Sequence, residues 1–192
     1  MGQLGLNERL KSREERAGME KARHKVEKFK RRENDILDAA LSLLIELGEE
    51  SVTVEQIASK VDIGKGTIYK HFTSKTEIYM RLLFDYEQSL GTKLKAAIEL
   101  ASKGDIKAPA RAYFESRIAN PVKDRLFQRL EEKIITLNQA PELIDELHQM
   151  RNAIQASLNK MFEHRIGEGK LKDVPPYYYY AAYWALTQGA VE

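Results

Sequence analysis

Hydrophobic residues recur at spacings of three and four along most of this chain, and such spacing is typical of amphipathic α-helices. The first clear stripe begins after residue 33 and comprises Ile36, Leu37, Ala40, Leu43, Leu44 and Leu47. Gly48 follows this stripe and is expected to end the helix in a left-handed conformation. The sequence lacks the strict apolar–polar alternation of half-buried strands, so the pattern predicts an all-α fold.

Two short helices joined by a tight turn are predicted next. Thr53 and Gln56 have the spacing of a capping box, which predicts a helix from Thr53 to about Val61. Asp and Gly at residues 62 and 64 favour a turn, and a third helix is expected over residues 66–72. This succession predicts a helix-turn-helix, in which the second helix enters the major groove of DNA.

A long helix and a series of further helices are predicted in the rest of the chain. Ser74 and Glu77 form a second capping box, and apolar residues recur at helical spacing from Ile78 to Ile98. More helices are expected over residues 105–119, 121–137 and 141–166, and from residue 175 to the end of the sequence. The first 32 residues carry few large apolar side chains, so they are predicted to be mobile or to extend the first helix.

Positive charge is concentrated in this N-terminal arm. The formal net charge is +2, yet residues 1–32 hold eleven Lys and Arg against five Asp and Glu. A basic arm ahead of a mildly acidic body indicates contact with a polyanion at one end of the molecule, and a merely solvated tail is the alternative.

Several classes of function are excluded or disfavoured by composition. The absence of cysteine excludes disulfides, thiolate zinc sites and cysteine nucleophiles. No run reaches the roughly 18–20 apolar residues of a membrane span, and the charged N-terminus does not resemble a signal peptide. His148 and His164 have no obvious catalytic partners, and Gly64-Lys65-Gly66-Thr67 lacks the upstream glycine of a phosphate-binding loop. We expect a cytoplasmic protein with no catalytic residues, no cofactor, no metal and no membrane partner.

The segment TVEQIASKVDIGKGTIYKHFTSKTEIYMRLL resembles the DNA-binding head of the tetracycline-repressor (TetR) family of regulators. The resemblance rests on Ala58, on the run from Gly66 to Tyr69, on His71-Phe72 and on the cap from Ser74 to Glu77. Asp62 departs from the family, which usually has glycine in this turn, and Glu55 stands where some members carry a base-reading arginine. We interpret Glu55 as solvated or capping; hydrogen bonding to cytosine is the alternative.

The resemblance implies contacts to DNA at matching positions of the head. Thr53 and Lys75 match phosphate contacts, and a helix N-terminus beside Lys75 would add to the attraction for an anion. The complete set of expected DNA-binding residues is Thr53, Lys65, Gly66, Thr67, Tyr69, Lys70, His71 and Lys75.

The resemblance also implies three parts: a basic arm over residues 1–32, a helix-turn-helix domain over 33–80, and a helical ligand-binding and dimerisation body over 81–192. The body ends inside what corresponds to the penultimate helix of the family, so a final helix is expected to be missing. Its implied partners are a second copy of the chain and a small apolar or amphipathic effector. Candidate effector-binding residues are Tyr86, Phe114, Phe127, Ile134, Met150, Ile154 and Trp184.

The sequence therefore predicts a ligand-responsive repressor that binds a pseudo-palindromic double-stranded DNA operator as a homodimer. An activator, or a DNA-binding protein without a small-molecule effector, is the alternative. A helical enzyme and a protein-assembly module are less consistent with the sequence, because no convergent set of titratable residues is visible and the head resembles a DNA-binding unit.

Overall fold

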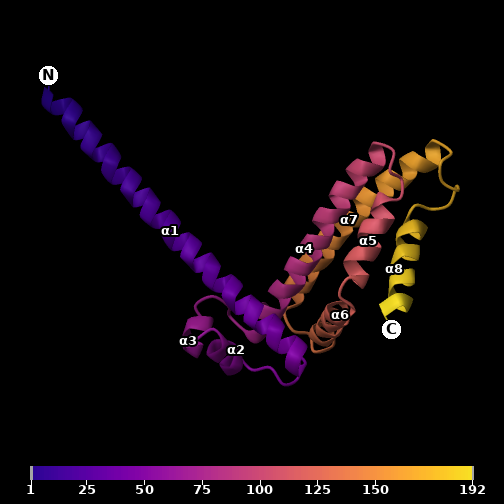
Figure 1. The fold of residues 1–192 in the computed structure, drawn as a ribbon, viewed down its shortest axis with the longest axis horizontal. Helices are drawn as coiled ribbons and strands as arrows, with labels where there is room; N and C mark the ends of the chain where they lie inside the picture. Colours follow the sequence, from indigo (N-terminus) through magenta and orange to yellow (C-terminus); the bar gives the residue numbers. More distant parts are fainter. Residues whose placement is uncertain (1, 192) are drawn as a thin grey trace.

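The computed structural model describes the backbone of residues 2–191, and the side chains of residues 16, 18–187 and 189. Over this range the chain forms helices and no strand, which confirms the predicted all-α fold (Figure 1). The helices are α1 (Gly2–Leu47), α2 (Val54–Lys60), α3 (Lys65–Ile68), α4 (Lys75–Ser102), α5 (Ala108–Ile118), α6 (Pro121–Thr136), α7 (Pro141–Gly167) and α8 (Tyr177–Val191).

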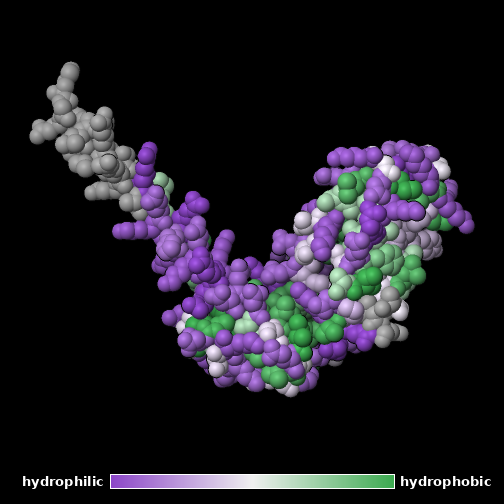
Figure 2. Space-filling view, in the orientation of Figure 1, coloured by the Kyte–Doolittle hydropathy of each residue, from purple (hydrophilic) through white to green (hydrophobic). Residues whose placement is uncertain are grey.

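The first helix is the longest element and projects away from the rest of the molecule (Figure 1). The sequence left open whether residues 1–32 are mobile or extend the first helix. The structure has the extended helix, because α1 runs as one helix of 46 residues from the arm into the head. The described side chains of the arm are exposed and largely hydrophilic (Figure 2). The C-terminal third of α1 is different, since Ile36 and Ala40 have no exposed surface there.

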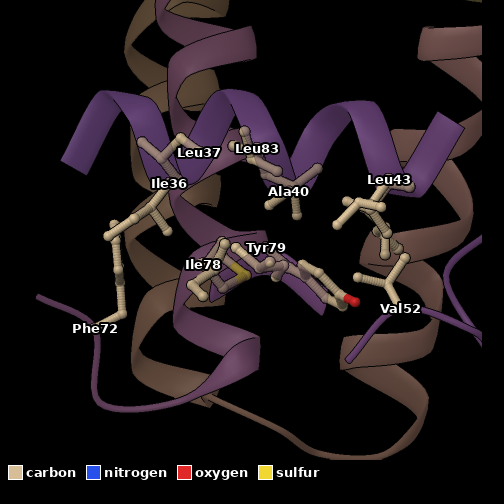
Figure 3. Packing of buried hydrophobic residues seen from close by; sticks show 14 of the residues in the cluster. Ile36, Leu37, Ala40, Leu43, Val52, Phe72, Ile78, Tyr79 and Leu83 are labelled. Carbon is tan, nitrogen blue, oxygen red and sulfur yellow. The ribbon is translucent and has the colours of Figure 1, made fainter. Parts of the chain in front are cut away.

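The head is built around this buried end of α1. Ile36, Leu37, Ala40 and Leu43 face Val52, Phe72 and the first turns of α4 across a single apolar cluster (Figure 3). Ile57 of α2 and Ile68 of α3 belong to the same cluster and are fully buried, so apolar burial fixes the two short helices against α1.

The turns of the head take the predicted form. Gly48 ends α1 with a φ of 77°, as expected of a left-handed cap. Asp62 adopts a φ of 52°, which an aspartate tolerates, so the turn keeps its shape without the usual glycine. Asp62 N–H donates to Ser59 O, and Ile63 N–H donates to Ala58 O, at 3.2 and 3.0 Å.

The third helix is shorter than predicted. It spans Lys65–Ile68 rather than residues 66–72, and the chain continues as a tight turn. Lys70 N–H and His71 N–H bond to carbonyl oxygens three residues earlier, at 3.1 and 2.9 Å. The shortening follows from the next helix, because Ser74 must be extended to cap Glu77 N–H at 3.0 Å.

The body consists of α4 to α8, and α4 belongs to both parts. Its first turns lie in the core of the head, while Leu90 and Leu94 pack with Tyr113 of α5 and with Leu158 and Phe162 of α7. Helix α6 packs against α1 and α4 and contributes Leu130 to their shared core. No helix within residues 2–191 is long and apolar enough to cross a membrane.

Candidate nucleic-acid interface

The start of α2 presents Thr53 at the surface of the head. Gln56 N–H donates to Thr53 Oγ1 at 3.2 Å, and Thr53 N–H donates to Gln56 Oε1 at 2.7 Å, which completes the predicted capping box. Thr53 and Gln56 are both exposed. The cap therefore fixes the exposed end of α2 at the place where the resemblance implies a phosphate contact.

An ion pair joins the two helices of the helix-turn-helix. Lys65 Nζ lies 2.5 Å from Glu55 Oε1, and both side chains are at least half exposed. The hydrogen bond from Lys65 lowers the pKa of Glu55, and the same bond raises the pKa of Lys65. The Lys65 ammonium also lies 5.9 Å from the centre of the exposed Tyr69 ring. Glu55 thus remains solvated, as interpreted from the sequence, but it also holds the side chain that is expected to reach DNA.

The outer face of α3 is open. A Cβ atom added to Gly66 would meet no protein atom within 4 Å, so packing within the protein does not require glycine there. Lys70 is exposed, and Thr67 is half-buried with its N–H bonded to Gly64 O at 2.8 Å. An open face without a side chain at Gly66 suits close approach of a duplex.

Lys75 is more firmly tied to the protein than the other expected DNA contacts. Its Nζ donates to Val52 O at 2.9 Å and lies 5.6 Å from the centre of the Tyr79 ring. The side chain is half-buried. Since an ammonium carries three N–H donors, the bond to Val52 still leaves donors for a phosphate.

His71 lies apart from this open face. Its side chain is only 7% exposed, and its ring lies 4.0 Å from the Phe29 ring of α1, centre to centre. The Nδ1 atom is 3.9 Å from Glu33 Oε1 and has no hydrogen-bond partner in the described structure. The structure therefore brings Thr53, Lys65, Gly66 and Tyr69 to the exposed surface of α2 and α3, and places His71 against α1.

The expected effector-binding residues do not meet in one cavity of the body. Tyr86 and Phe127 line a cavity of about 490 Å³ beside α1, and Met150 lines one of about 360 Å³ where the head meets the body. Trp184 lines a third cavity of about 450 Å³ between α5, α6, α7 and α8. Ile134 is part of the buried core. The other two pack elsewhere in the body, Phe114 against Tyr113 and Tyr183, and Ile154 against Gly91.

Sequence reasoning missed a buried network of charges between α4, α5, α6 and α7. Glu87 Oε1 lies 2.9 Å from Arg151 Nη2 and 3.3 Å from Arg117 Nη2. Arg117 also pairs with Asp124 at 3.0 Å, and Arg151 pairs with Glu131 at 2.5 Å. Glu87 follows Leu83 by four residues and precedes Leu90 by three, so its place on the apolar face of α4 was the available signal.

The geometry of the head and body defines an all-α protein with an exposed helix-turn-helix. The sequence profile described as "Bacterial regulatory proteins, tetR family" matches residues 36–82, which include the whole of this unit. The chain is 29% identical over 154 residues to the HTH-type transcriptional regulator RutR of Escherichia coli, covering 80% of this chain and 70% of RutR. It is 23% identical over 145 residues to the HTH-type transcriptional regulator SrpR of Pseudomonas putida, covering 71% of this chain.

Solved structures share the fold of head and body. The TetR-family regulator PfmR of Thermus thermophilus superimposes with a TM-score of 0.67 at 21% identity, over 81% of this chain and 84% of PfmR. The ketosteroid transcriptional regulator KstR2 of Mycobacterium tuberculosis superimposes with a TM-score of 0.63 at 19% identity, over 83% of this chain and 81% of KstR2. The chain is similar to the TetR family of bacterial regulatory proteins over residues 36–82, and its head and body have the fold of solved TetR-family regulators. It spans 62% of SrpR and about half of the nucleoid occlusion factor SlmA of Actinobacillus pleuropneumoniae, to which it is 30% identical over 100 residues.

Proposed function

We propose that this protein is a sequence-specific transcriptional regulator, not an enzyme, that acts in the cytoplasm and reads double-stranded DNA through α2 and α3. The observation that carries the proposal is the exposed set Thr53, Lys65, Gly66 and Tyr69 on these two helices. The basic arm of α1 adds positive charge next to the head, which would strengthen binding to phosphates in a salt-dependent way.

The proposal includes a homodimer on a pseudo-palindromic operator. Helix α8 presents Ala181, Ala185 and Gly189 at intervals of four residues, and all three are exposed in the single chain. Trp184 and Leu186 beside them are 53% and 62% exposed. Small residues on one ridge let a second helix approach closely, and a two-fold dimer would place two recognition helices on two half-sites.

We further propose that the protein is a repressor released by a small apolar or amphipathic effector. The support is the family, together with the name of the structurally similar KstR2, which links that protein to ketosteroids. A regulator without an effector in the body is the second candidate. It is favoured by the close packing around Tyr113, which is fully buried and whose ring lies 5.9 and 6.0 Å from those of Tyr180 and Tyr183.

Selection of bound duplexes from a random DNA pool tests the DNA-binding proposal directly. The expected product is a pair of inverted half-sites whose centres lie about one helical turn or a multiple of it apart. Sedimentation of the protein with the selected duplex then gives the number of copies per operator. Recovery of unselected sequence at low salt would refute sequence-specific reading, and a direct repeat would refute the two-fold dimer.

A further inference from the structure

A cavity of about 360 Å³ lies where the head meets the body. Its walls come from α1, from the turn that precedes α4, from α4 itself and from the first half of α7. The volume is within the range of small-molecule sites in proteins. A ligand in this cavity would touch the turn after α3 on one side and the body on the other.

The walls of this cavity carry an excess of negative charge. Glu33, Glu77, Asp85 and Glu146 line it together with a single guanidinium, that of Arg81. Glu77 is engaged by Thr73, whose N–H and Oγ1–H donate to it at 2.5 and 2.6 Å. Among the side chains that the structure describes, Asp85 and Glu146 form no ion pair within 4.0 Å. Desolvation raises the pKa of Asp85 although Arg81 and Lys123 act to lower it, so a further cation nearby would stabilise its charge.

His71 contributes a ring nitrogen without a hydrogen-bond partner to the same wall. Its side chain is more than nine-tenths buried, it lines the cavity, and its Nδ1 has no hydrogen-bond partner in the described part of the chain. Glu33 Oε1 is 3.9 Å from Nδ1. A nitrogen placed about 2.8 Å from both atoms would subtend an angle of roughly 90°, about 20° less than the angle between two N–H bonds of an ammonium group, so Glu33 would have to move slightly to receive it. The Glu33 side chain is 25% exposed and can rotate to admit such a group.

The rest of the lining determines what kind of cation fits. Phe84, Leu143 and Met150 supply apolar surface beside the carboxylates of α4 and α7. No three acidic or histidine side chains in the described part of the chain come close enough to share a metal ion. The cavity therefore favours a cation with N–H donors and an apolar body over a bare metal ion.

We propose that this junction cavity binds an amphipathic organic cation, with its ammonium group between His71 Nδ1 and Glu33 and its apolar part against α7. Asp85 and Glu146 complete the neutralisation of its charge. The ligand would link α7 of the body to the turn that follows the recognition helix. Binding itself stands without the proposed function; only an effect of the ligand on operator affinity rests on it.

Calorimetric titration of the whole protein with 4-phenylbutylamine, in the absence of DNA, tests the proposal. The matched probe 4-phenylbutanol has the same apolar body without the charge, and 4-phenylbutyrate reverses the charge. We expect the amine to bind and the alcohol to bind about tenfold more weakly or not at all, because it lacks a charge-assisted hydrogen bond. Equal affinity for the amine and the alcohol would overturn the proposal, and so would an absence of amine binding.

Two variants locate the binding site. Glu33→Gln and Asp85→Asn should each weaken amine binding several-fold, while Asp145→Asn, on an exposed position of α7 outside the cavity, should leave it unchanged. Wild-type affinity in both cavity variants would place the amine elsewhere and refute the assignment. If a variant fails to fold by circular dichroism, nitrogen-15 spectra of the wild-type imidazoles keep the test decisive: the amine must shift the Nδ1 resonance of His71, and an unmoved resonance refutes the site. Failure of DNA selection with intact amine binding would count against the proposed function alone.

Discussion

Glu87 Oε1 of α4 accepts a hydrogen bond from Arg151 Nη2 of α7 at 2.9 Å, with the Glu87 side chain only 3% exposed. Burial acts to lower the pKa of Arg151, but Glu131 and Glu87 outweigh it and hold the pKa above its usual range. A carboxylate and two guanidiniums thus lie inside the body as a mutually dependent set.

Removing the charge of Glu87 should destabilise the protein strongly. In Glu87→Gln, Arg117 keeps its pair with Asp124 and Arg151 keeps its pair with Glu131, but both guanidiniums lose the buried carboxylate that they share. The loss of a hydrogen bond to a charged group costs about 1.5–3 kcal/mol. Urea denaturation followed by circular dichroism measures the change. Glu99→Gln, on an exposed turn of the same helix, is the control and should be near neutral. A loss below about 1 kcal/mol for Glu87→Gln would mean that water or rearranged side chains replace the carboxylate.

Freeing Lys65 from its carboxylate should strengthen DNA binding. In Glu55→Gln the 2.5 Å ion pair is lost, and the repulsion between Glu55 and phosphates disappears with it. We expect affinity for the selected operator to rise several-fold in fluorescence anisotropy titrations. Lys60 and Glu46 pair at 3.0 Å on the same head, so Glu46→Gln serves as the control. A fall in affinity together with relaxed preference at one base pair would instead support hydrogen bonding of Glu55 to cytosine.

The two lysines of the interface should differ in what they contribute. Lys65→Ala should weaken operator binding and relax base preference, because Lys65 lies at the head of the recognition helix. Lys75→Ala should weaken binding to all sequences alike. It should also reduce the salt dependence of the binding constant by about the amount that one phosphate contact contributes. The readout is affinity for the operator and for a scrambled duplex over a salt series. Sequence-blind effects of equal size from both substitutions would contradict these roles.

Lys75→Ala also removes the hydrogen bond from Lys75 to Val52 O, so the substitution can reduce the stability of the head as well as its affinity for DNA. Lys75→Arg restores the charge and a donor, so it should recover most of the affinity. A thermal unfolding curve for each variant separates weakened binding from weakened folding.

Alkaline pH should destabilise the fold through buried tyrosines. Desolvation raises the pKa of Tyr79 to about 12 and that of Tyr113 to about 12, from an ordinary value of 10.0. Between these values the unfolded chain has lost protons that the folded chain retains, so stability falls as pH rises from 10 toward 12. Phenolate absorbance during titration should show these tyrosines ionising later than the exposed ones, and Tyr79→Phe should reduce the pH dependence of the unfolding free energy. Ionisation of all nine tyrosines in one transition near 10 would contradict this prediction.

The sequence was sufficient for the head because local chemistry determines it. The capping box from Thr53 to Gln56, the cap at Ser74 and the left-handed Gly48 each depend on residues within one turn of chain. The length of α3 was wrong because the chain has to leave that helix early to reach Ser74, a constraint that helical periodicity does not contain.

Long-range features were beyond the sequence patterns. Glu87 meets Arg151 across 64 positions, and His71 meets Phe29 across 42. The helical period signals that Glu87 lies on the apolar face of α4, but it does not identify the partner in either contact. The prediction of the effector-binding residues rests on helical spacing and residue type. Helical spacing and residue type are the same for residues of the core and for residues that line a cavity. Ile134, for example, lies in the buried core.

Helix α4 is shared by head and body without a break, and this continuity has a mechanical consequence. Its 28 residues make a rod about 42 Å long. Pivoting such a rod by about 5° moves its far end by nearly 4 Å, comparable to the rise of one base pair in duplex DNA. A small rotation at the C-terminal turns of α4 therefore produces a larger displacement at its N-terminal end, next to the helix-turn-helix. No hinge within the helix is needed to transmit this displacement.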